Sequence, residues 1–164
     1  MCSPSSLPSF KFNGQVYREK EVGGRLCKAI SASTSILLPI RDKPKCLRSR
    51  LALIDTGAAF SILGKNHWGN CHYEQVLSRK DMKESKEFPE ISGIYQGKLT
   101  DVALAVVRFS LVNSRQENSP IYKGVFRLVE QNLRRTILGW FGFLDFHGVS
   151  TSGKTGEVCI YDGY

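Results

Sequence analysis

Short apolar runs separated by glycine and polar turns make up most of this chain, and few stretches have the apolar spacing of a helix. Strand-like runs occupy residues 34–40, 51–54, 99–109, 121–129 and 157–161. The sequence contains 15 glycines, and glycine between short apolar runs is typical of β-hairpins. The pattern predicts an all-β fold, as a small closed barrel or a sandwich, with one short helix near the C-terminus at 141–146.

The beginning of the chain has a different pattern from the rest. Residues 1–9 are rich in serine and proline, which predicts disorder. Two short possible strands follow, at Gln15–Arg18 and Leu26–Ile30, separated by the Gly23-Gly24 pair. We therefore expect a partly disordered N-terminal extension over residues 1–33 and one domain over residues 34–164. A helix is expected in the polar stretch around 73–80.

Composition narrows the class of protein further. A length of 164 residues with 41% hydrophobic residues suits one domain with its own core. No apolar stretch approaches 18 residues, and the start lacks a charged segment followed by an apolar one, so neither a membrane span nor a signal peptide is expected. Five irregularly spaced cysteines suit reduced thiols, and we expect a cytoplasmic protein.

A net charge of +8 raises the question of an acidic partner. Residues 41–50 contain five basic side chains and one acidic side chain, Asp42, so the net charge of this ten-residue segment is +4. The segment suits a solvated loop between two strands, or alternatively a contact to nucleic acid or an acidic protein. No aromatic residue interleaves it, so stacking on bases has no platform, and a nucleic-acid partner is not expected.

One carboxylate stands out because it lies between two apolar runs. Asp55 follows the apolar segment 51–54 and precedes Thr56 and Gly57. Burial of an unpaired carboxylate is costly, and such residues are retained where they carry out chemistry. Gly57 permits a tight turn at the end of the strand, and backbone N–H groups together with the Thr56 hydroxyl can orient the carboxylate.

The run Leu53-Ile54-Asp55-Thr56-Gly57-Ala58-Ala59-Phe60-Ser61-Ile62-Leu63 resembles the active-site motif of aspartic proteases, and its single copy resembles the retropepsin-like group. A second element of that family, two apolar residues and a glycine before a short helix, is similar to Ile137-Leu138-Gly139. The resemblance covers roughly residues 34–164. It implies a retropepsin-like small closed barrel and hydrolysis of peptide bonds, with Asp55 as the catalytic residue supported by Thr56 and Gly57.

The resemblance also implies two chains. This chemistry uses two carboxylates, one as base toward water and one as acid toward the scissile carbonyl, and the chain has one such motif. The second Asp55 would come from another copy across a two-fold axis. We therefore expect a homodimer that acts on peptide or protein substrates, without a cofactor or a metal. Terminal strands, Glu157–Tyr161 among them, would build the rest of the interface.

Substrate contacts follow from the same resemblance. A hairpin within residues 88–107 would be the flap that closes over a peptide, with Gly93, Ile94 and Tyr95 near its tip; an ordinary barrel hairpin is the alternative. Ala58, Ala59 and Ile137 would line the cleft. Many family members carry an ion pair between an Asp and an Arg at the positions of Ala59 and Trp140, so here an apolar contact would replace it.

Two other functions are compatible with the same sequence. The chain is alternatively a catalytically inactive dimerisation or binding module of the same fold, or a basic barrel that binds nucleic acid.

Residues 148–155 match G-x-x-x-x-G-K-[ST], but no helix is expected after them, so a polar hairpin turn is favoured over a phosphate site. His67, Cys71 and His72 cluster in sequence without a fourth ligand, which favours structural roles over zinc.

Overall fold

The computed structural model describes residues 7–77 and 99–162, and more than half of these residues lie in β-strands. The strands are β1 Phe10–Asn13, β2 Gln15–Val22, β3 Arg25–Ser31, β4 Ser33–Ile40, β5 Lys43–Ile54, β6 Ile62–Leu63, β7 Gln75–Leu77, β8 Asp101–Val112, β9 Tyr122–Val129, β10 Thr136–Leu138, β11 Gly148–Thr151 and β12 Glu157–Tyr161. A single helical turn, α1, covers Lys65–Trp68. The expected all-β class is confirmed.

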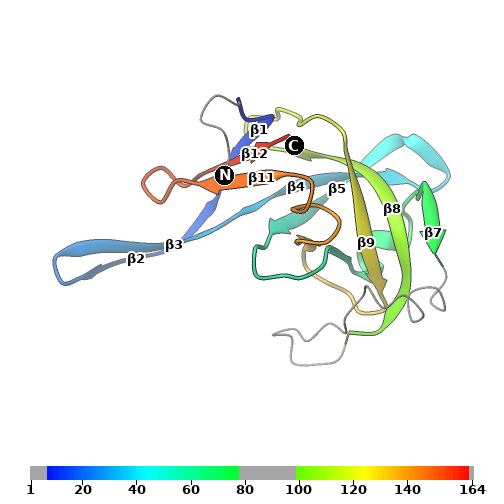
Figure 1. Ribbon diagram of the computed structural model, residues 1–164, viewed down its shortest axis with the longest axis horizontal. Helices are drawn as coiled ribbons and strands as arrows, with labels where there is room; N and C mark the ends of the chain where they lie inside the picture. Colours follow the sequence, from blue (N-terminus) through cyan, green and yellow to red (C-terminus); the bar gives the residue numbers. More distant parts are fainter. Residues whose placement is uncertain (1–6, 78–98, 163–164) are drawn as a thin grey trace.

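Six strands close into a barrel (Figure 1). Their order is β4-β5-β10-β6-β9-β8, and pairing of β4 with β8 completes the circle. The closing register places Ser35 opposite Val112 and Leu37 opposite Ser110. β7 adds to the outer edge of β8. Closure removes the free edges of the main sheet, so the barrel predicted from the sequence is confirmed.

The barrel interior is filled by aliphatic and aromatic side chains from alternate strand positions. Its largest fully buried members include Phe126, Phe143, Ile36 and Leu111. Phe143 lies within 6 Å of Phe109 and Tyr122, at centroid distances of 5.8 and 5.7 Å. The aromatic cluster therefore ties the segment after β10 to strands β8 and β9.

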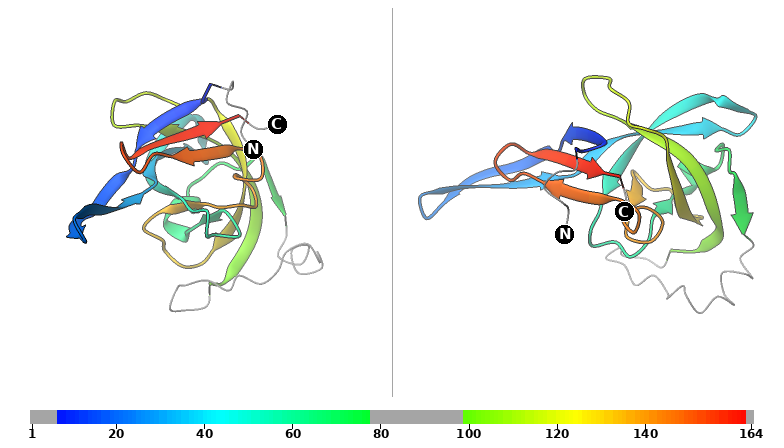
Figure 2. Two further views of the ribbon diagram at one scale, coloured as in Figure 1. Left: turned by 60° about the vertical axis from the view of Figure 1, so that its left-hand side comes forward. Right: turned by 45° about the horizontal axis from the view of Figure 1, so that its top comes forward.

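Two smaller sheets lie outside the barrel. β1, β12 and β11 form an antiparallel sheet with β12 in the centre, and Phe10 pairs with Ile160. β2 and β3 form a hairpin of their own, which projects from the body beside the β11–β12 hairpin (Figures 1 and 2). Gly23 and Gly24 make its turn with φ of 57° and 74°, which is the reason both positions are glycine. The short strands expected near 15–18 and 26–30 are thus parts of the two strands of one long hairpin.

Three expectations about local structure were wrong. The segment 141–146 is a turn and not a helix, because Gly142 adopts φ of 95° and donates its N–H to Asp145 Oδ1. The one described helix is α1 instead. Within the region expected to be helical near 73–80, Gln75–Leu77 form strand β7, which pairs with β8.

The basic segment 41–50 was also misjudged, since it is mostly strand β5 and only residues 41–42 form the turn. The pairing register shifts here, so that Lys43 is opposite Ile40 while Arg48 is opposite Leu38. Residues 41–49 are exposed and Arg50 is half-buried, so the charged side chains of this segment lie at the surface.

The match to a phosphate-binding motif is a hairpin, as favoured from the sequence. β11 pairs with β12, and the turn between them is closed by the Gly156 N–H bonded to Ser152 O at 2.8 Å. A phosphate loop needs a following helix, whereas here a strand follows. Among the described residues, no helix has the length and apolarity needed to cross a membrane.

Candidate functional site

The two sequence motifs, about 80 residues apart, meet in the structure. β10, with Ile137 and Leu138, is inserted between β5 and β6, parallel to the first and antiparallel to the second. The Asp55–Ser61 loop that joins β5 to β6 therefore passes around the end of β10. Leu138 is opposite Ile54 in the register, so the end of β10 lies beside the start of the Asp55 loop.

Backbone hydrogen bonds fix Asp55 in this loop. Its N–H donates to Leu138 O at 3.0 Å, and its carbonyl accepts the Ala58 N–H at 3.1 Å. The carboxylate oxygen Oδ1 accepts the Gly57 N–H at 2.9 Å. Asp55 is half-buried, while Thr56 and Gly57 are exposed. The carboxylate is thus oriented by its own loop and remains open on one side.

Ser61 and Gly139 lock the loop to the second motif. The Gly139 N–H donates to Ser61 Oγ at 3.0 Å, and both residues are buried. A Cβ at position 139 would lie 2.3 Å from Phe60 O and 2.8 Å from Ala58 O, so only glycine fits. Glycine at this position therefore permits a close approach of the two backbones that a side chain would prevent.

Trp140 holds the loop from its exposed side. Its indole N–H donates to Thr56 O at 2.6 Å, and its backbone N–H donates to Ala58 O at 3.0 Å. The side chain is nevertheless 53% exposed. The indole N–H therefore fixes the Thr56 carbonyl, whereas the sequence led us to expect a contact between Trp140 and Ala59.

A small apolar cluster lies under the loop and contains two of the residues expected to contact substrate. Ile137 is 3% exposed and packs with Phe60, and Ala58 packs against the cluster as a half-buried residue. Ala59 is exposed. The other expected contacts, Gly93, Ile94 and Tyr95 of the flap, lie outside the described residues.

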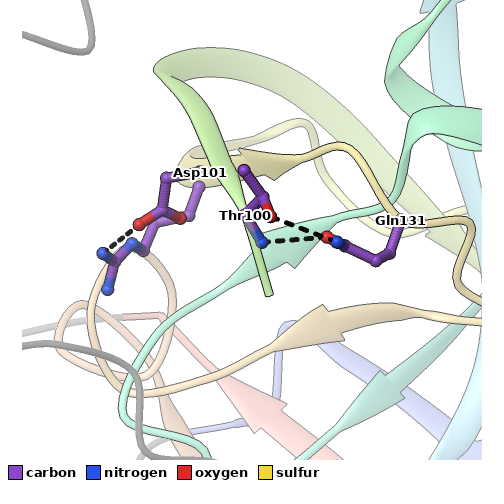
Figure 3. A network of polar contacts seen from close by, with 4 residues as sticks. Thr100, Asp101 and Gln131 are labelled. Carbon is purple, nitrogen blue, oxygen red and sulfur yellow. Dashed lines mark hydrogen bonds and ion pairs between the residues drawn. The ribbon is translucent and has the colours of Figure 1, made fainter. Parts of the chain in front are cut away.

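An ion pair borders this cluster and was missed from the sequence. Arg127 of β9 donates to Asp101 Oδ2 at 2.5 Å and stacks over Phe60, with its guanidinium carbon 4.5 Å from the ring centroid. The neighbouring Gln131 accepts the Thr100 N–H at 2.9 Å (Figure 3). The available signal was an arginine inside the apolar segment 125–129, because such a residue needs a partner when it is buried.

His67 of α1 supports β10 from the opposite side. Its Nδ1 lies 2.8 Å from Thr136 Oγ1, and both side chains are buried. Burial, with the nearby Arg50 charge, lowers the pKa of His67 to about 4. Cys71 is packed in the barrel core, where burial raises its pKa to about 12. Within residues 7–77 and 99–162, no group of three His, Cys, Asp or Glu side chains is placed to hold a metal.

The structure changes the expectation for the terminal strand. β12, Glu157–Tyr161, pairs with β1 on one edge and β11 on the other, both from its own chain. Its main-chain hydrogen bonds are therefore made within the chain, and any contact through this sheet would use β1 or β11.

Comparisons with known proteins identify no relative. No family model matches the chain, and neither the curated proteins nor the solved structures contain a match.

Proposed function

We propose that this chain is a retropepsin-like aspartic endopeptidase that works as a homodimer. The observation that carries the proposal is the insertion of β10 between β5 and β6, which brings Leu138 and Gly139 against the Asp55 loop. The resemblance of the two motifs to that family was noted from the sequence, and their spatial meeting is an independent reason to treat them as one site.

The geometry suits activation of water by paired carboxylates. One Asp55, oriented by the Gly57 N–H, would take a proton from water, and its counterpart from the second copy would give a proton to the scissile carbonyl oxygen. Two carboxylates at close range share one proton, because both cannot remain ionised. The exposed Thr56 and Gly57 lie where the second loop would meet the first.

The substrate would be an extended peptide. Its side chains would contact the half-buried Ala58 and the exposed Ala59, and the flap expected near Gly93 would cover it. No cofactor or metal takes part in this chemistry.

A cleavage screen tests the proposal. Wild type should hydrolyse members of a peptide library between about pH 4 and 7.5, and a statine-type inhibitor such as pepstatin should block it, because its hydroxyl imitates the tetrahedral intermediate. Asp55→Asn should abolish cleavage while the circular dichroism spectrum is kept. Asp42→Asn, in the exposed β4–β5 turn, is the matched control and should cleave normally.

A mixing experiment tests whether the two carboxylates come from two chains. Asp55→Asn chains added in excess to wild type should lower activity per wild-type chain, because mixed dimers hold one carboxylate. Activity that follows wild-type concentration alone would contradict a shared site. A dimer that binds peptides but cleaves none would identify the chain as an inactive module of this fold.

A further inference from the structure

The β2–β3 hairpin, residues 15–31, is an arm that projects from the body and is exposed over most of its length. It forms a separate two-stranded sheet, and all eight residues of β2 are exposed. A two-stranded hairpin alone in water is only marginally stable. A projecting hairpin of this length therefore indicates a contact outside the chain.

The arm begins and ends beside the Asp55 strand. Ala32, which follows β3, accepts the Ile54 N–H at 2.9 Å, and Ile54 directly precedes Asp55. Tyr17 of β2 accepts a hydrogen bond from Arg135 at 2.6 Å, one residue before β10. The arm thus leaves the body at the end of the barrel where Asp55 lies, so a second copy placed against Asp55 would lie beside it.

One face of the arm is basic and partly apolar. Cross-strand neighbours share a face, and the register pairs Val22 with Arg25 and Lys20 with Cys27. A bulge separates Val16 from Arg18, which is opposite Ala29 on this same face. The face therefore carries Arg18, Lys20 and Arg25 together with Val22, which is 56% exposed. We name it the basic arm face.

The Asp55 site carries a surface of the complementary kind. In the turn after β10, Trp140 and Phe146 are 53% and 57% exposed, and Asp145 between them is also exposed. Trp140 bonds to Thr56, the residue that would face the second copy. Exposed aromatics beside a carboxylate match a face of aliphatic and basic side chains, and tryptophan is a frequent centre of binding energy at interfaces.

We infer that in the homodimer the basic arm face of each chain contacts the Trp140–Phe146 turn of the other, an inference that rests on the proposed function. Eight strand residues span about 26 Å, so an arm that starts near the two-fold axis reaches across its neighbour. The contact is reciprocal, as a two-fold axis requires. The arms would hold together the two loops that supply the carboxylates.

Removal of the arm tests this contact. Gln15 and Ser31 are paired, so residues 16–30 are replaced by Gly-Gly, which keeps a two-residue turn at that point. Sedimentation equilibrium should show a dimer for wild type and for Asp55→Asn, and a monomer for the shortened chain at the same concentration. A shortened chain that dimerises as tightly as wild type would overturn the inference, and so would a wild type that stays monomeric.

Point variants keep the test valid if the shortened chain fails to fold. Val22→Asp should weaken dimerisation by about tenfold, whereas Leu47→Asp, on the distant β4–β5 hairpin, should not; the two side chains are 56% and 53% exposed. Lys20→Glu and Asp145→Lys should each weaken the dimer, and the combination should restore it. Failure of that rescue would overturn the choice of the turn as the contact.

The outcomes separate this inference from the proposed function. Arm variants that dissociate a dimer which cleaves no peptide would support the contact and remove the protease. A shortened chain that remains dimeric and active would support the protease and overturn the arm contact. A third outcome is a monomeric wild type that binds oligonucleotides in a salt-sensitive way and loses this binding when the arm is changed. This result would overturn the inference and identify nucleic acid as the partner of the arm.

Discussion

The Asp55 loop and the β2–β3 arm start from neighbouring points of the fold but are held in opposite ways. Seven residues of loop, 55–61, receive backbone, side-chain and aromatic contacts from β10 and the turn after it. The arm, with seventeen residues in 15–31, is exposed over most of its length, and Lys28, midway along β3, donates its Nζ to Lys154 O at 3.0 Å. The contrast teaches that the fold fixes the proposed catalytic group within one chain and leaves most of the arm exposed, where the proposed second copy would bind.

The largest expected effect is loss of the contact between the two motifs. Gly139→Ala would force a Cβ to 2.3 Å from Phe60 O, and the backbone cannot yield without parting the loop from β10. We expect a loss of about 3 kcal/mol or more in unfolding free energy, measured by urea denaturation, because the contact is with backbone atoms that cannot move aside. Gly153→Ala is the control, since nothing lies within 4 Å of its Cβ position and its stability should be unchanged. Equal stability of both variants would refute the described close approach.

The next effect concerns the ion pair beside the loop. Arg127→Met would leave Asp101 without its buried counterion, and we expect a loss of about 3 kcal/mol. The double variant Arg127→Met/Asp101→Asn should recover part of the lost stability, because no unpaired carboxylate remains. In Arg108→Met, the ion pair with Glu74 is lost from an exposed site, where about 0–1 kcal/mol is expected. If the two single variants melted at the same temperature, the Arg127 pair would not be supporting the loop.

The buried His67, which contacts Thr136 of β10, predicts that the unfolding free energy depends on pH. Its pKa in the folded chain is about 4, below the ordinary value near 6.5, so folding favours the neutral ring. This contribution is complete above about pH 6.5 and is lost as pH falls toward 4, by roughly 3 kcal/mol. The difference in unfolding free energy between wild type and His67→Gln, measured across this range, isolates it. A difference that stays constant with pH would contradict burial of the neutral ring.

The smallest effect is expected in the arm. Leu26→Ser removes an apolar side chain that is 67% exposed, so the unfolding free energy of the monomer should change by less than about 0.5 kcal/mol. Leu138→Ala, at a fully buried position of β10, should cost about 2–5 kcal/mol. Hydrogen exchange of arm amides should be fast in dilute protein and slow at concentrations where dimers form. Slow exchange under both conditions would remove the contrast between the two regions.

Sequence patterns predicted the barrel well because its strands have clear apolar runs. Thr34–Ile40 and Ile121–Val129 were expected as strands and are β4 and β9 within one residue at each end. The pattern failed where a strand is exposed: residues 43–50 of β5 read as a loop because their side chains are charged and face solvent. It also failed at 141–146, where the left-handed Gly142 prevents a helix that the apolar residues alone would permit.

What the sequence by itself determined is the all-β class, the strand that ends at Asp55, and the two motifs with their spacing, since each depends on local order along the chain. The tertiary structure alone decided that β10 passes between β5 and β6, that Trp140 bonds to Thr56, and that residues 15–31 leave the body as an arm. These features depend on which distant segments hydrogen-bond to one another. Such pairings are selected by the packing of the whole barrel, and no local run of residues encodes them.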